Sequence, residues 1–192
     1  YFVYRNGTYI NALGQSFRDF IKGNLPALPG ELPRISDWAD HLTTIFPEVR
    51  LKQFLEMRGA DGGPWNRICA LPAFWVGILY DQNCLDAAWD ICKNWTSLQR
   101  DELRLSASKS GLDGSVDNIS FKSLAKEILA ISLTGLKARK KISASNPEKD
   151  ETHFLDILLE STRTGVTPAD ELIVSFREKW KNKHEIFKEY SY

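Results

Sequence analysis

Ionisable side chains share one parity in residues 48–58, where Arg50, Lys52, Glu56 and Arg58 stand an even number of positions apart. Alternate side chains of an extended chain point to the same face, so the pattern predicts one strand with a charged face and an apolar face. A carboxylate oxygen suits Mg²⁺, and guanidinium groups bind phosphates and carboxylates. The pattern therefore indicates a metal or phosphate site. On the strand pattern alone, an exposed face with Glu56 paired to Arg58 or Lys52 is the simpler interpretation.

Composition limits the classes of partner. The chain has 192 residues, 43% of them apolar, which is enough for one sizeable core. Its 25 basic and 25 acidic residues cancel, and no apolar run approaches a membrane span, so we expect neither a nucleic-acid nor a membrane partner. Cys69, Cys84 and Cys92 lack the short paired spacing of a zinc site. They favour reduced thiols in a cytoplasmic protein without a structural metal.

Strand and loop signals dominate residues 1–63. The pair Asn6 and Gly7 separates two short extended runs and predicts a β-hairpin. A short helix is expected next, ahead of a proline-rich loop. Ser36 or Asp37 is expected to cap a further helical turn before the charged strand.

Helical spacing dominates residues 64–192. The expected features are Pro72 in a first helical turn, a capping box from Thr96 to Gln99, a helix over 119–136 with Leu124, Ile128 and Ile131 on one face and Gly135 at its end, a polar loop over 137–151, and a last helix capped by Thr167. Strands precede helices, so the predicted class is α+β, a partial antiparallel sheet followed by a helical region.

Four segments carry a resemblance to a known family. They are residues 41–52 (HLTTIFPEVRLK), 55–61 (LEMRGAD), 63–77 (GPWNRICALPAFWVG) and 164–169 (TGVTPA). Together they resemble the glutamate–cysteine ligases of plants and proteobacteria. The similarity runs through nearly the whole chain, although the family's chain is more than twice this long. The resemblance therefore implies a C-terminal portion of such a ligase, with an N-terminal remainder as its partner.

The resemblance implies an ATP-dependent reaction that joins the γ-carboxylate of L-glutamate to the amine of L-cysteine through a γ-glutamyl phosphate. This family shares a catalytic sheet with glutamine synthetases, so residues 1–63 are expected to form part of that sheet and residues 64–192 the helical C-terminal region. In glutamine synthetases a strand of the form Arg-x-Glu-x-Arg supplies a metal ligand and a substrate or phosphate arginine. Glu56 then corresponds to the Mg²⁺ ligand and Arg58 to the arginine.

Two further positions bear on the predicted site, one that departs from the motif and one that matches it. Phe54 stands where the motif has its first arginine, which leaves that role to Lys52 or Arg50. Asp61 also matches the family motif and is a candidate for ATP binding, with an Asx turn or a helix cap as its structural alternative.

Two other functions stay open: another carboxylate–amine ligase on the same sheet, and a non-catalytic helical binding or regulatory module.

Overall fold

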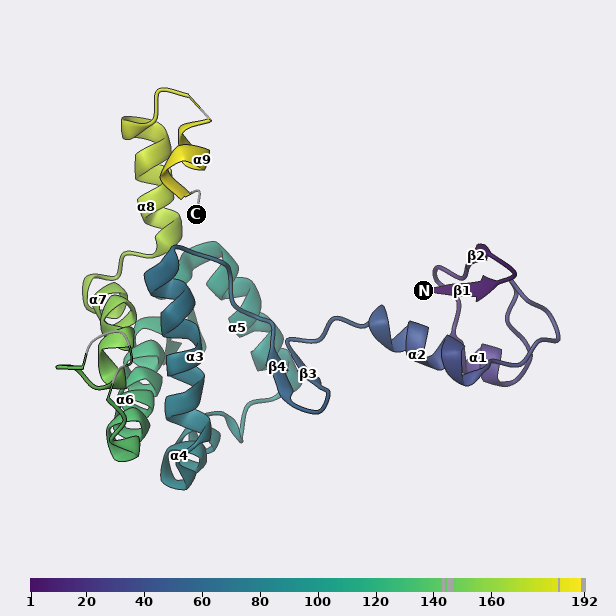
Figure 1. Cartoon of the computed structure of the whole chain (residues 1–192), viewed down its shortest axis with the longest axis horizontal. Coiled ribbons are helices and arrows are strands. Elements are labelled where there is room, and N and C mark those ends of the chain that lie inside the picture. Colours follow the sequence, from purple (N-terminus) through teal and green to yellow (C-terminus); the bar gives the residue numbers. More distant parts are fainter. Residues whose placement is uncertain (143, 145–146, 183, 191–192) are drawn as a thin grey trace. The chain divides into compact units, whose positions relative to one another are not determined.

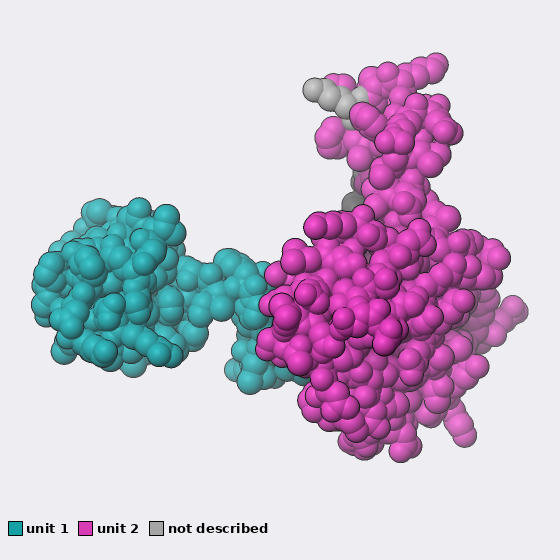
Figure 2. All heavy atoms as spheres, turned by 180° about the vertical axis from the view of Figure 1, so that it is seen from behind, with its two compact units in different colours: residues 1–60 teal, residues 61–192 magenta. Residues whose placement is uncertain are grey.

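The computed structural model describes residues 1–142, 144, 147–182 and 184–190. Small antiparallel hairpins and many helices make up the chain, so the class is α+β, as predicted (Figure 1). The chain divides into two compact units, residues 1–60 and residues 61–192 (Figure 2). This division does not test the assignment of residues 1–63 to a catalytic sheet, which stays a prediction.

Unit 1 begins with the hairpin that the sequence predicts. Strands β1 (Phe2–Arg5) and β2 (Thr8–Asn11) pair antiparallel, with Arg5 opposite Thr8. Between them Asn6 has φ 50° and Gly7 has φ 84°. Two successive positive φ angles are what a tight two-residue hairpin turn requires, and Asn and Gly tolerate them best.

Two short helices follow the β1–β2 hairpin in unit 1. Helix α1 (Phe17–Ile21) is capped by Ser16, and α2 (Ile35–Thr43) begins after Arg34. Asp37 does not stand at the cap position but in the first turn, where its Oδ2 accepts a hydrogen bond of 2.7 Å from the Arg34 N–H. The buried core consists of Val3, Ala12, Phe17, Phe20 and Leu25.

The prediction of one strand over residues 48–58 is wrong. Two three-residue strands, β3 (Val49–Leu51) and β4 (Leu55–Met57), form a tight antiparallel hairpin instead. The turn between them contains Lys52, Gln53 and Phe54 and has no glycine, proline or asparagine, so no turn signal marks it in the sequence. The charged and apolar parities are nevertheless kept, because residues opposite each other in a hairpin share a face.

Unit 2 is mainly helical, as predicted. Its elements are α3 (Trp65–Leu79), α4 (Gln82–Cys92), α5 (Ser97–Ser110), the 3₁₀ turn η1 (Gly111–Asp113), β5 (Ser115–Val116), β6 (Ile119–Ser120), α6 (Phe121–Arg139), the 3₁₀ turn η2 (Glu151–Leu155), α7 (Asp156–Thr164), α8 (Pro168–Val174), the π-helical turn η3 (Ser175–Lys179) and α9 (Glu185–Tyr190). The predicted caps Thr96 and Thr167 both form capping boxes. Among the described helices, none is long and apolar enough to span a membrane.

Helices α3 and α6 pack side by side (Figure 1). Small residues lie where the two helices come closest. A Cβ added to Gly77 would lie 2.2 Å from the Ser132 carbonyl oxygen, and one added to Gly135 would lie 1.8 Å from the Gly77 carbonyl oxygen. The buried Ser132 hydroxyl donates a 2.9 Å hydrogen bond to the Phe74 carbonyl. A side chain at either glycine would therefore collide with the backbone of the facing helix. Helix α6 continues to Arg139, so Gly135 lies inside the helix and does not end it, contrary to the prediction.

Three further expectations about unit 2 need correction. Pro72 lies in the interior of α3, which begins at Trp65. The buried face of α6 carries Phe121, Leu129 and Leu136 rather than the predicted Leu124, Ile128 and Ile131, which are half-buried. The first residues of the predicted polar loop extend α6 to Arg139, while residues 143, 145 and 146 of that loop lie outside the described residues.

Candidate functional site

The β3–β4 hairpin brings Glu56 between two arginines. Arg50 stands directly opposite Glu56 in the strand register. Its Nε lies 2.7 Å from Glu56 Oε2, and Arg58 Nη1 lies 3.3 Å from the same oxygen. All three side chains are half-buried, with exposed fractions of 24% for Arg50, 30% for Glu56 and 28% for Arg58. The turn thus makes Arg50 the cation nearest to Glu56. In a single strand the two residues would stand six positions apart along the chain.

The two guanidinium groups hold Glu56 in its charged form. The hydrogen bond from Arg50 lowers the pKa of the Glu56 carboxyl most, and the hydrogen bond from Arg58 and the charge of Lys52 add to it. Both hydrogen bonds that Glu56 accepts from these arginines end on Oε2, and no described residue donates one to Oε1. Glu56 therefore presents one further carboxylate oxygen beside a cluster with an excess of positive charge.

Lys52 and the nearby aromatic rings frame this cluster. The Lys52 ammonium lies 5.9 Å from the centre of the Phe54 ring in the turn, and the Arg58 guanidinium lies 5.0 Å from the centre of the Phe46 ring. Of the two candidates for the missing motif arginine, the hairpin brings Arg50 to the carboxylate, whereas Lys52 contributes only through its charge. The role of Phe46 was not anticipated, since no spacing rule relates it to Arg58.

Asp61 is exposed and begins unit 2. Helix α3 is preceded by Pro64 at its cap position, so Asp61 is not the cap of that helix. No group of three or more histidine, cysteine or acidic side chains that could hold a metal occurs within the described residues. Glu56 by itself therefore offers a single ligand, and a bound Mg²⁺ would need further oxygen ligands.

A second cluster of titratable groups lies in unit 1 around His41. The imidazole stacks on Phe17 with ring centres 4.5 Å apart and meets the ring of Tyr1 edge-on at 4.8 Å. Burial lowers the pKa of His41 and raises that of Tyr1. The Tyr1 hydroxyl and His41 Nδ1 are both buried, and neither has a hydrogen-bond partner among the residues that the structure describes. The aromatic packing favours a structural role for His41.

Comparison with known proteins decides the family. The family model described as glutamate–cysteine ligase family 2 (GCS2) matches residues 1–189. The chain belongs to this family. The chloroplastic glutamate–cysteine ligase of Solanum lycopersicum is 48% identical over 193 residues, which cover 100% of this chain and 35% of the relative. That of Medicago truncatula is 49% identical over 181 residues, covering 94% of this chain and 34% of the relative.

The family members matched here are much longer than this chain, which spans about a third of their length. The Arabidopsis thaliana relative, 46% identical over 193 residues, is likewise covered to only 35%. These relatives are named chloroplastic, so the expectation of a cytoplasmic protein is wrong. The three cysteines are free, as expected, but cysteine spacing bears on disulfide pairing and does not identify a compartment.

Proposed function

We propose that this chain is the C-terminal portion of an ATP-dependent glutamate–cysteine ligase, which carries out the first step of glutathione biosynthesis. The observation that carries the proposal is the family match from residue 1 to residue 189. The substrates would be L-glutamate, L-cysteine and ATP. The β3–β4 hairpin supports the proposal independently, because it holds a carboxylate and several cations on one face.

The reaction has a clear electrostatic demand. A carboxylate is a poor acyl donor, so an oxygen of the glutamate γ-carboxylate attacks the terminal phosphoryl group of ATP and ADP leaves. The amine of cysteine then attacks the acyl carbon of the γ-glutamyl phosphate. The C–N bond forms as the C–O bond to phosphate breaks, and the amine loses a proton. Both steps move negative charge among phosphate oxygens, which nearby cations stabilise.

The hairpin residues suit these roles. Arg58 and Arg50 would bind the anionic substrate or the transferring phosphoryl group, and Lys52 would add positive charge at the rim. Glu56 would hold both guanidinium groups through Oε2 and offer Oε1 to Mg²⁺. When bound, Mg²⁺ would neutralise phosphate charge and orient the triphosphate. Asp61 would contact ATP through its ribose hydroxyls or through the metal.

The remaining ligands would come from elsewhere in the ligase. One carboxylate and a few cations cannot assemble a complete phosphoryl-transfer site. We therefore propose that the N-terminal remainder of the polypeptide supplies them, and that the β3–β4 hairpin belongs to a catalytic sheet like that of glutamine synthetases. The isolated chain would then lack ligase activity.

Substitutions in the full-length parent ligase test the assignment. Arg58→Ala should lower turnover about 100-fold or more, because it removes a cation that stabilises transition-state charge. Glu56→Gln should chiefly weaken Mg²⁺ binding, and excess Mg²⁺ should recover part of the activity. The measurement is ATP-dependent formation of γ-glutamylcysteine at low and high Mg²⁺. Arg18→Ala and Glu102→Gln alter exposed residues of the same types outside the hairpin and serve as matched controls.

The outcomes separate the possible functions. Normal turnover of both hairpin variants at low Mg²⁺ would leave the Arg50–Glu56–Arg58 cluster as an ion-pair network without a catalytic role. Turnover with amines other than cysteine, and none with cysteine, would indicate another carboxylate–amine ligase. Failure of the parent to bind Mg²⁺ and ATP would favour a non-catalytic module.

A further inference from the structure

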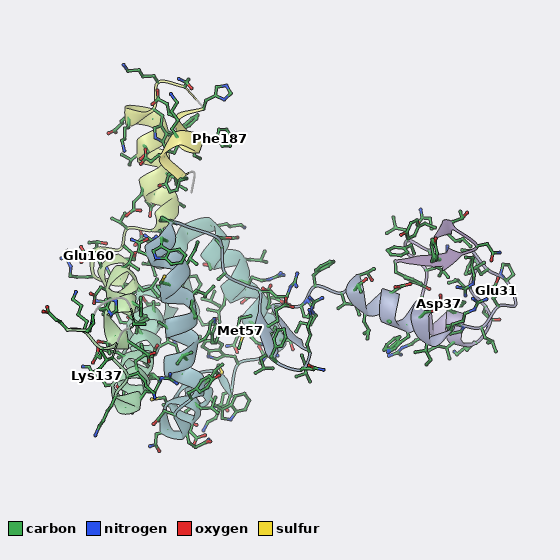
Figure 3. All side chains as sticks on the ribbon, viewed as in Figure 1. Glu31, Asp37, Met57, Lys137, Glu160 and Phe187 are labelled. Atoms are coloured by element: carbon green, nitrogen blue, oxygen red, sulfur yellow. The ribbon has the colours of Figure 1, made fainter. Side chains whose placement is uncertain are left out.

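Arg58 is the less firmly held of the two arginines that contact Glu56. Its Nη1 lies 3.3 Å from Glu56 Oε2, which is longer than a hydrogen bond usually is, and Arg50 Nε contacts the same oxygen at 2.7 Å. The two guanidinium groups also repel each other, because they carry like charges on one face of the hairpin. Arg58 follows Met57, the last residue of β4, which Figure 3 labels. The carboxylate of Glu56 alone therefore holds the Arg58 side chain weakly.

The ring of Phe46 gives Arg58 a second contact. The guanidinium carbon stands over this ring, 5.0 Å from its centre. The face of an aromatic ring attracts a cation, and arginine is the cation most often found there. Two contacts of different kinds, one with a carboxylate oxygen and one with a ring, restrict the guanidinium more than either contact would alone.

The local sequence and the hairpin register place the ring beside Arg58. Pro47 follows Phe46 directly, and a residue before proline avoids the helical conformation, so Phe46 lies outside α2, which ends at Thr43. The Arg58 N–H donates to the Glu48 carbonyl at 2.8 Å and continues the pairing of the hairpin by one residue. Once that register is known, Phe46 is the diagonal neighbour of Arg58 on the charged face, within reach of a long side chain.

Burial does not account for the position of this ring. Phe46 is 70% exposed, and it does not belong to the buried core of unit 1. The Arg58 side chain is only 28% exposed. The contact with Arg58 is therefore the feature of Phe46 that needs an explanation.

We propose that Phe46 is a positioning residue of the ligase, whose ring fixes the Arg58 guanidinium in the orientation that stabilises charge on the transferring phosphoryl group. This inference rests on the proposed function, which gives Arg58 that role. Phe46 acts through Arg58 and contacts neither ATP nor glutamate. An arginine that is already held in place loses less freedom when it binds the phosphoryl group, so the ring raises the rate of the chemical step.

Steady-state kinetics of the full-length parent ligase test this role. Phe46→Leu keeps an apolar side chain and removes the aromatic face. It should lower kcat about 3- to 30-fold, the worth of one cation–π contact, and leave the KM values for glutamate and ATP within about twofold. Phe46→Tyr keeps the aromatic face and should retain the wild-type kcat. Phe187→Leu is the matched control, because Phe187 is 69% exposed and lies in unit 2, and it should change neither constant.

A double-mutant cycle separates positioning from a general effect on the fold. Arg58→Ala removes the group through which Phe46 acts. Adding Phe46→Leu to Arg58→Ala should therefore lower kcat by no more than a further factor of about two. If the ring had only a structural role, Phe46→Leu would lower kcat by the same factor in both backgrounds, and that result would overturn the proposal.

The orientation of Arg58 can also be followed without turnover. In NMR spectra of the parent ligase labelled at arginine, the Arg58 Nε–Hε resonance is identified by its loss in Arg58→Ala. Phe46→Leu should shift this resonance, because the ring current of the phenyl group is lost, and Phe187→Leu should leave it in place. A resonance that does not move in Phe46→Leu would show that the ring does not hold Arg58.

Failure of this inference differs from failure of the proposed function. If Arg58→Ala is slow and Phe46→Leu turns over normally, the positioning role is overturned and the proposed role of Arg58 stands. If Arg58→Ala itself turns over normally, the proposed role of Arg58 is refuted. The positioning role then falls with it, even where the resonance shifts in Phe46→Leu.

Discussion

Replacing Asp37 by asparagine should destabilise unit 1 more than any exposed charge change in the chain. The Asp37 side chain is 3% exposed and receives Arg5 Nη1 at 2.7 Å and Arg5 Nη2 at 2.8 Å. The Arg5 side chain is itself only 9% exposed, and its Nε contacts Glu31 at 2.9 Å. Figure 3 shows Asp37 and Glu31 in this unit. The pair connects β1 to the first turn of α2.

The magnitude follows from burial and from what the substitution leaves behind. Removing one member of a buried ion pair costs about 3–5 kcal/mol, because the other charge stays buried. Asparagine keeps one acceptor oxygen and Arg5 keeps Glu31, so we expect a loss of about 2–3 kcal/mol. The hydrogen bonds from Arg5 lower the pKa of Asp37. Its contribution is therefore present above the unfolded pKa of about 3.9 and is lost as the pH falls through the lower folded pKa.

Hydrogen exchange measured by mass spectrometry on peptides from residues 1–60, over a urea series, reports the stability of this unit alone. Glu31→Gln should have a smaller effect, because Glu31 is 46% exposed. Glu160→Gln is the matched control, since Arg163 contacts that carboxylate with two bonds of 2.8 and 2.6 Å at an exposed site. It should change nothing measurable in unit 2. If Asp37→Asn is as neutral as this control, the buried pair does not stabilise unit 1.

Two further predictions concern packing and protonation. Gly77→Ala should destabilise unit 2 by about 1–3 kcal/mol, because the new methyl group would collide with the Ser132 carbonyl. Thermal unfolding measures this loss. Gly62→Ala is the control and should not destabilise the unit, because the space around its Cβ is open. Burial lowers the pKa of His41, so the unfolded state binds more protons as the pH falls through about 6.5, and unit 1 should lose stability between pH 7.5 and 5.5. His41→Phe should keep the stack on Phe17 and abolish that pH dependence; a slope that persists would assign it to another group.

Local chemistry explains the parts of the fold that the sequence predicts. The turn at Asn6 and Gly7 needs positive φ angles that few residues accept, so the hairpin β1–β2 is readable from two residues. The capping boxes at Thr96 and Thr167 are likewise local, because each threonine bonds to a backbone group three residues away. Such features depend on neighbours in sequence and not on tertiary contacts.

Tertiary contacts decided the features that the sequence did not predict. The buried face of α6 follows from its crossing with α3, where Gly77 and Gly135 touch, and apolar spacing alone selected a neighbouring stripe. Arg5 and Asp37 are 32 positions apart, and no local pattern relates them. Proline favours the first turn of a helix, and the sequence therefore predicts a helix start at Pro72. Pro72 instead lies exposed inside α3. Because it has no N–H, it leaves one backbone carbonyl of the preceding turn unbonded, and water can reach that carbonyl at the exposed face.

The candidate site shows how a wrong element can leave the right residues together. A single strand and a hairpin both keep Arg50, Glu56 and Arg58 on one face, because side chains alternate with the same period in each. Only the hairpin places Arg50 directly opposite Glu56, at 2.7 Å. Phe54, which departs from the motif, lies in the turn, while Arg50 lies on the strand that pairs with Glu56. On the proposed function, Arg50 of the opposite strand would take the role of the arginine that the motif has at position 54.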